Sequence, residues 1–117
     1  MADPRPNPRF IVSEFADDPD MRELVAMFLD EMPDRIGMIE AASREGRVGD
    51  LRRLAHQLKG AAGGYGFGVV GEAAGRLEEA LTAEASGSEP SADLVAIRAQ
   101  VEELLDMCRS VRARASG

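Results

Sequence analysis

The sequence is poor in aromatic residues and contains a single cysteine and a single histidine. Tryptophan is absent, and Cys108 is the one cysteine in the chain. A lone cysteine excludes an internal disulfide, which is typical of proteins in a reducing cytoplasm. One histidine and one cysteine, set apart in the sequence, also cannot supply the usual ligand set of a metal site. We therefore expect a cytoplasmic protein that binds no metal.

Long hydrophobic runs and an excess of positive charge are missing as well. No segment approaches the run of about 18 apolar residues that a membrane span requires. The polar, proline-rich residues 1–9 lack the apolar core of a secretion signal. The formal net charge is −7 at pH 7, whereas nucleic-acid-binding proteins present a basic surface. We expect the chain to bind neither membranes nor nucleic acid.

The residues that are abundant favour packed helices. A length of 117 residues suffices for one hydrophobic core and not for two, and alanine, leucine, glutamate and arginine are common helix formers. We expect flexible tails at residues 1–9 and 114–117 and one domain over residues 10–113. The apolar residues that follow the first tail are expected to cover one end of the core: Phe10, Ile11, Val12 and Phe15.

The longest apolar repeat predicts a first helix over residues 18–45. Asp18 and Pro19 favour a helix start. Pro33 lies inside the repeat and is expected to kink the helix, the alternative being two helices divided at Met32. The apolar residues that recur at steps of three and four are Met21, Leu24, Val25, Phe28, Leu29, Met32, Ile36 and Ile39.

Three further helices are expected. The second begins near Asp50 and ends near Tyr65, the third follows a glycine-rich turn, and a loop over residues 86–90 precedes the fourth. We expect the four helices to form an antiparallel, up-down four-helix bundle without strands, with the N-terminal segment covering one end. The inward residues of the last two helices are expected to be Val70, Ala73, Ala74, Leu77, Leu81, Leu94, Ile97, Val101, Leu104, Cys108 and Val111.

The single histidine, His56, lies on the outer face of the second predicted helix. At ~100° per residue, the apolar residues of this helix fall roughly 140° to 240° away from it. His56 is therefore expected to point into solvent. A neutral imidazole is nucleophilic, and with a reference pKa of about 6.5 much of it is neutral at cytoplasmic pH. The nearest residues on this face are Arg52, Lys59, Gly60 and Gly63, with Gln57 about 100° round.

Charge and glycine content distinguish this face from an ordinary solvated one. Residues 47–60 carry four basic side chains and one acidic one, a net charge of +3, which favours a phosphoryl group and attracts an acidic partner. Glycines here each cost the helix up to about 1 kcal/mol relative to alanine, but they leave room for the backbone of another protein. The docking residues we expect are Arg52, Arg53, Gly60, Gly63 and Gly64.

Residues 56–66, HQLKGAAGGYG, are similar to the signature of histidine-containing phosphotransfer (Hpt) domains, in which His-x-Leu-Lys-Gly precedes small residues and a later glycine. The resemblance covers roughly residues 18–113. The sequence departs from the commonest pattern after Phe67, where many members carry proline.

This resemblance implies a phosphocarrier of phosphorelays. His56 would accept the phosphoryl group on its distal ring nitrogen, Lys59 and Gln57 would hydrogen-bond the phosphoryl oxygens, and Gly60 would leave space for the partner. The implied partners are receiver domains of response regulators and of hybrid histidine kinases, which carry the acceptor aspartate and Mg²⁺. No cofactor and no kinase activity are expected in this chain.

Two other functions compete with that of a phosphocarrier. A binding module of the same fold would dock receivers without carrying phosphate, but the presence of His56, Lys59 and Gly60 argues against it. The dimerisation and phosphotransfer domain of a kinase that has lost its ATP-binding part would need a long helical-hairpin dimer seam, and an intrinsic kinase would also need an ATP site. Because no exposed apolar stripe is evident, we expect a monomer.

Several other patterns are interpreted as structural. Residues 66–71 spell G-x-G-x-x-G but lack the preceding strand of a dinucleotide site. Cys108 and the first-helix methionines Met21, Met27, Met32 and Met38 are expected to fill the core or its rim. Ordinary solvated faces are expected for Glu78, Glu79, Glu102, Glu103 and Asp106.

Overall fold

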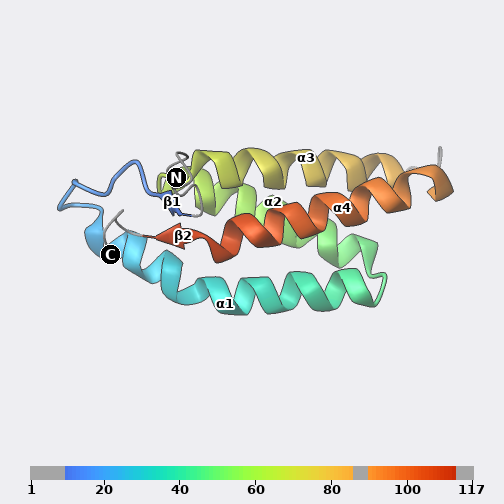
Figure 1. Cartoon of the computed structure of the whole chain (residues 1–117), viewed down its shortest axis with the longest axis horizontal. Helices are drawn as coiled ribbons and strands as arrows, with labels where there is room; N and C mark the ends of the chain where they lie inside the picture. Colours follow the sequence, from blue (N-terminus) through green and yellow to red (C-terminus); the bar gives the residue numbers. More distant parts are fainter. Residues whose placement is uncertain (1–9, 86–89, 113–117) are drawn as a thin grey trace, which may run out of the picture.

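The computed structural model describes residues 10–85 and 90–112, with side chains described for 10–83 and 97–112. Helix α1 packs on α2 and α4, and α3 packs on the same two helices, which gives the predicted antiparallel four-helix bundle (Figure 1). The expected tails, residues 86–89 of the expected loop and the side chain of Leu94 lie outside the described part, whereas Pro90, also expected in the loop, is the first residue of α4. The elements are β1 (Ile11–Val12), α1 (Arg22–Arg44), α2 (Val48–Gly64), α3 (Gly68–Ala85), α4 (Pro90–Arg109) and β2 (Val111–Arg112).

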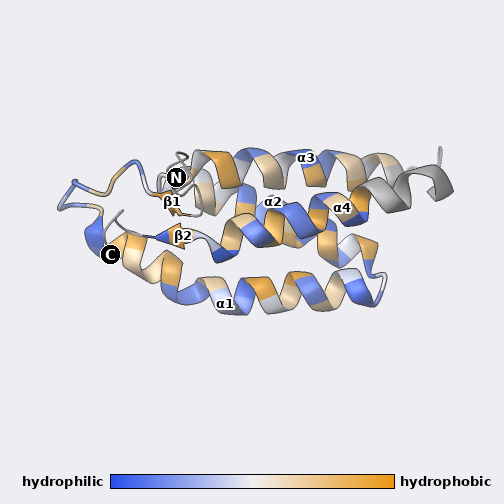
Figure 2. Cartoon of the chain, viewed as in Figure 1, coloured by the Kyte–Doolittle hydropathy of each residue, from blue (hydrophilic) through white to orange (hydrophobic). Residues whose placement is uncertain are grey.

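Apolar and polar residues alternate around each described helix (Figure 2), and the apolar faces meet in one core. All five residues predicted to face inward on α3 are buried, as are the predicted residues of α4 from Ile97 to Cys108. Each fully buried leucine, such as Leu58 or Leu77, contributes roughly 1.5–3 kcal/mol to folding. Within the described residues, no helix is both long and apolar enough to cross a membrane.

Helix α1 is continuous through Pro33, so the alternative of two separate helices was wrong. Figure 1 shows its N-terminal part inclined to the rest, as expected where proline removes one backbone hydrogen bond. The predicted start at Asp18 was also wrong. The Asp18 carboxylate accepts a hydrogen bond from the Asp20 N–H at 2.9 Å, and its carbonyl accepts one from Met21 at 3.0 Å. Asp18 therefore closes a turn, and the helix begins at Arg22.

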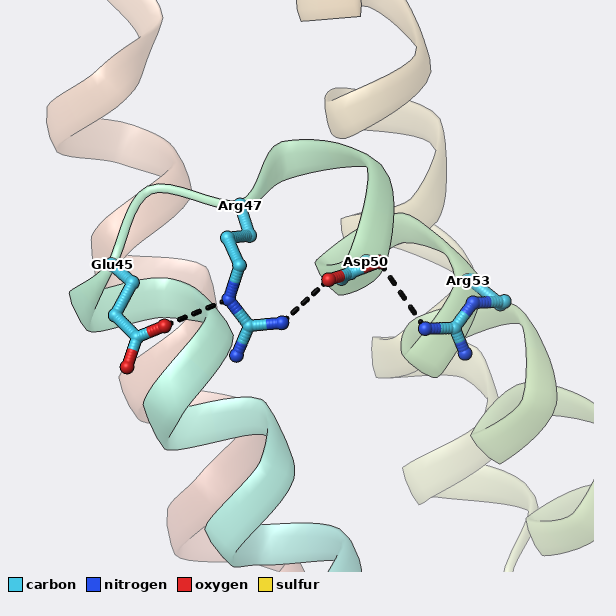
Figure 3. Close-up of polar contacts among 4 residues, drawn as sticks. All are labelled: Glu45, Arg47, Asp50 and Arg53. Atoms are coloured by element: carbon cyan, nitrogen blue, oxygen red, sulfur yellow. Dashed lines mark hydrogen bonds and ion pairs between the residues drawn. The ribbon is translucent and has the colours of Figure 1, made fainter.

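Helix α2 begins at Val48, two residues before the predicted cap Asp50. No side chain caps its first residues; Asp50 lies instead within the first turn, where its negative charge complements the helix dipole. Figure 3 shows that Asp50 bridges Arg47 and Arg53, and that Arg47 also pairs with Glu45. The carboxylate of Asp50 thus neutralises arginines instead of capping the backbone, and the hydrogen bonds from Arg47 and then Arg53 lower its pKa.

A short parallel strand pair, which the sequence did not predict, joins the two ends of the described chain. Ile11 pairs with Val111 in β1 and β2, and the Ile11 N–H donates to the Ser110 carbonyl at 2.8 Å. Val111 is buried as expected but lies in β2, beyond the end of α4. Ile11 and Phe15 pack against the core, so the N-terminal segment covers one end of the bundle, whereas Phe10 is 45% exposed.

Gly66, which ends the turn after α2, anchors this N-terminal segment. Its φ of +90° is the left-handed conformation that favours glycine. Its carbonyl accepts a hydrogen bond from the Glu14 N–H at 2.8 Å, and the buried Ser13 hydroxyl donates to the neighbouring Tyr65 carbonyl at 2.7 Å. Gly68, two residues further on, is the first residue of α3.

We expect Gly66→Ala to lower the free energy of unfolding by about 2–4 kcal/mol, because it combines left-handed strain with overpacking. A Cβ atom at this position would lie 2.5 Å from Ser13 Oγ and 2.8 Å from the Glu14 nitrogen. Gly46→Ala is the matched control, since Gly46 also has positive φ but no atom within 4 Å of the added Cβ; about 1 kcal/mol is expected there. If urea denaturation gives equal losses of unfolding free energy for the two variants, the close contact of Gly66 with the N-terminal segment is not what makes glycine necessary there.

Candidate functional site

His56 lies in the middle of α2 and points away from the core, as the helical periodicity predicted. Its side chain is 66% exposed, while Leu54 and Leu58 on the opposite side of the helix are buried. The imidazole is thus held on a rigid helix and remains open to another protein.

Glu78 of α3 lies beside His56 and connects it to Lys59. One carboxylate oxygen, Oε2, lies 2.9 Å from His56 Nδ1, and the other, Oε1, lies 3.3 Å from Lys59 Nζ. The Glu78 side chain is only 22% exposed, compared with 49% for Lys59. The three side chains form a contiguous group, which we call the His56–Glu78–Lys59 triad. The prediction that Glu78 belongs to an ordinary solvated face was wrong.

The protonation of Glu78 determines which nitrogen of His56 is available. Partial burial, the largest single influence, raises the pKa of Glu78, but the hydrogen bonds and charges of His56 and Lys59 outweigh it and bring the pKa below its ordinary value. An ionised carboxylate can only accept hydrogen bonds. Nδ1 must therefore carry the proton toward Glu78, which leaves the lone pair of a neutral ring on Nε2.

The side chains of the other polar residues predicted for the site, Gln57, Arg53 and Arg52, are not bonded to this triad. Gln57 is exposed, and its side chain bonds to none of the described residues. Arg53 is 58% exposed and pairs with Asp50 at 3.2 Å, so it does not turn toward His56. Arg52 is half-buried and has no acidic partner within the described chain. Asp50 is already counted in the net charge of +3, and the carboxylates from outside the segment, Glu45 on Arg47 and Glu78 on Lys59, reduce it further.

The glycines of α2 leave an open surface. Gly60, Gly63 and Gly64 are exposed, and a Cβ atom added to any of them would meet nothing within 4 Å. Their own packing therefore does not require glycine.

A groove between α1 and α2 adjoins this surface, with Gly60 and Gly64 along one wall and Leu24 and Met27 on the other. Leu24 is 41% exposed and Met27 54% exposed. Both had been predicted as core or rim residues, as had Met38, which is 49% exposed. The exposed apolar patch of Leu24 and Met27, one helix away from His56, was therefore not predicted from the sequence.

Cys108 and the G-x-G-x-x-G run have the structural roles expected of them. Cys108 is buried, and its burial raises the pKa of the thiol to about 11, so it is a packing residue. The G-x-G-x-x-G run forms the turn between α2 and α3 and the start of α3, with Phe67 buried in the core. Within the described residues, no group of three or more histidine, cysteine or acidic side chains could hold a metal ion.

A family model described as the Hpt domain matches residues 23–113 of the chain. The match covers α1 from its second residue and all of α2, α3, α4 and β2, and it includes the His56–Glu78–Lys59 triad. No curated protein and no solved structure matches the chain.

We expect the neutral ring of His56 to be protonated on Nδ1, because Glu78 accepts that proton. In Glu78→Ala the ring should change toward the tautomer protonated on Nε2, since the acceptor is gone. The measurement is the ¹⁵N chemical shift of both ring nitrogens above pH 8. Glu79→Ala removes an exposed carboxylate one residue further along α3 and should leave the tautomer unchanged; the same spectrum for both variants would contradict the assignment.

Proposed function

Because the chain belongs to the Hpt domain family, we propose that His56 accepts a phosphoryl group from the aspartate of a receiver domain. The donor receiver belongs to a response regulator or a hybrid histidine kinase, and His56 then passes the group to a response-regulator aspartate. The family carries out histidine phosphotransfer in phosphorelays. The observation that most supports His56 is its geometry: Nδ1 bonds to Glu78 at 2.9 Å, which leaves Nε2 on the exposed side of a rigid helix.

In the proposed step, the Nε2 lone pair attacks the phosphorus of an aspartyl phosphate as the bond between phosphorus and the aspartate oxygen breaks. The aspartate leaves as a carboxylate, and the ring, still protonated on Nδ1, gains positive charge. The adjacent carboxylate of Glu78 stabilises this charge, as an acidic residue does for a catalytic imidazolium. Return transfer reverses the same bonds, so no proton needs to leave or enter the site.

Lys59 and Gln57 are proposed to hydrogen-bond the phosphoryl oxygens. Lys59 Nζ is 3.3 Å from Glu78 and half of its side chain is exposed, so the ammonium group can contact both the carboxylate and an incoming phosphate. Gln57 is exposed and has no competing partner within the described chain. Phosphoryl transfer requires mainly this kind of positioning and charge stabilisation.

The surface formed by Leu24, Met27, Gly60 and Gly64 is proposed to dock the receiver. Exposed apolar side chains beside a cleared helix surface are typical of protein interfaces, and the patch adjoins the face that carries His56. We propose that the chain acts as a monomer with no kinase activity of its own. The Mg²⁺ needed for transfer belongs to the receiver in this proposal.

Replacing His56, the proposed acceptor, should abolish phosphorylation of the chain. Incubated with a phosphorylated receiver, the wild-type chain should gain an acid-labile, base-stable phosphoryl group, and His56→Gln should gain none. The side chain points outward, so the circular dichroism spectrum and the melting temperature should change little. A label that survives in folded His56→Gln would place the acceptor elsewhere and refute the proposal.

Docking should be sensitive to bulk at Gly60. Gly60→Glu introduces a large, charged side chain into the open surface and should weaken receiver binding by at least about tenfold. Ala99→Glu adds the same glutamate at an exposed position of α4 and is expected to bind normally. Binding is measured by titration calorimetry with a receiver; equal affinities for the two variants would show that the partner docks on another face.

A further inference from the structure

The helices α2 and α3 approach so closely that part of α3 lies against the backbone of α2. Gly71 of α3 is buried, and a Cβ atom there would lie 3.2 Å from the Lys59 carbonyl oxygen and 3.4 Å from the Gly63 nitrogen. Any larger residue would push the helices apart. Gly71 therefore sets the distance between α2 and α3 that the side chains of the triad must bridge.

One turn further along α3, Gly75 faces the aliphatic stem of Lys59. A Cβ atom on Gly75 would lie 3.0 Å from Lys59 Cδ and 3.8 Å from Lys59 Cγ. Apart from its chain neighbours and the backbone of its own helix, it would meet no other atom within 4 Å. The space left by the missing side chain is thus occupied by a single group, the stem of the lysine.

The path of this stem brings the ammonium group to Glu78. From Gly75 the next turn of α3 carries Glu78, whose Oε1 lies 3.3 Å from Lys59 Nζ. A helix interior gains up to about 1 kcal/mol when glycine is replaced by alanine, so the backbone of α3 has no reason of its own for glycine at this position. The positive φ values among the described residues belong only to Gly46 and Gly66.

We infer that Gly75 is a positioning residue for phosphotransfer: the absence of its side chain lets the Lys59 stem pass between α2 and α3, so that the ammonium group lies beside both Glu78 and the face of His56. The inference rests on the proposed function, because the consequence of moving Lys59 is a slower transfer. An alanine Cβ at Gly75 would displace the stem without meeting His56 or Glu78, because Lys59 alone supplies the atoms within 4 Å of it.

The test compares Gly75→Ala and Gly75→Leu with Gly37→Ala. Gly37 is also inside a helix, and an added Cβ there meets nothing within 4 Å. Both alanine variants should be at least as stable as the wild type. Only the Gly75 variants should transfer more slowly from a phosphorylated receiver, by about fivefold for alanine and more for leucine, because small displacements of a positioning group are costly in rate.

Two further measurements separate positioning from a general structural effect. In a Lys59→Ala background, Gly75→Ala should cause no additional loss of rate, since it acts through the lysine. By ¹³C NMR, the carboxyl of Glu78 should titrate at higher pH in Gly75→Ala than in the wild type, because the cation has moved away.

The outcomes distinguish failure of this inference from failure of the proposed function. If the wild type carries no phosphoryl group, the function is wrong, while the NMR titration still tests whether Gly75 positions Lys59. If the wild type transfers normally and Gly75→Ala is as fast as Gly37→Ala, the inference is overturned. It is also overturned if Gly75→Ala slows transfer equally with and without Lys59.

Discussion

The close contact between α2 and α3 is the constraint on which the rest of the site depends. Gly71 lets the two backbones approach, so a hypothetical Cβ would lie 3.2 Å from the Lys59 carbonyl oxygen. The short turn between the helices fixes their register, because Phe67 is buried in the core and Gly66 holds a left-handed conformation. At that distance and register, a glutamate on one helix can hold a histidine and a lysine on the other.

A consequence of this arrangement is that the basic side chains around the site are paired with carboxylates, except for Arg52 among the described residues. In the triad, the negative charge of Glu78 balances that of Lys59, and near the start of α2 the two arginines of Figure 3 pair with two carboxylates. Such pairs are screened and short in range. Recognition of a partner by this face therefore depends more on shape and apolar contact than on long-range attraction.

The sequence predicted the features that arise within one helix and missed those that require two. Helical periodicity placed His56 outside and Leu58 inside, because both follow from 3.6 residues per turn. Glu78 belongs to another helix, so its role depends on register. The signal was nonetheless present: His56 and Glu78 are equally far from the turn at residue 67, as are Lys59 and Gly75. Helix starts were misplaced because Asp18 and Asp50 use their carboxylates in turns and ion pairs instead of caps.

Two features that lower the stability of the bundle, exposed apolar side chains on α1 and glycines within α2, lie at the same place on the surface. Leu24 and Met27 expose apolar area that the core could have buried, and each cleared glycine of α2 costs about 1 kcal/mol relative to alanine. Neither feature is explained by packing, since no described atom lies within 4 Å of a Cβ added at Gly60 or Gly64. Natural sequences break such rules chiefly where function requires it. Because both features line one groove beside His56, the surface is better explained by a partner that covers it than by the stability of the bundle.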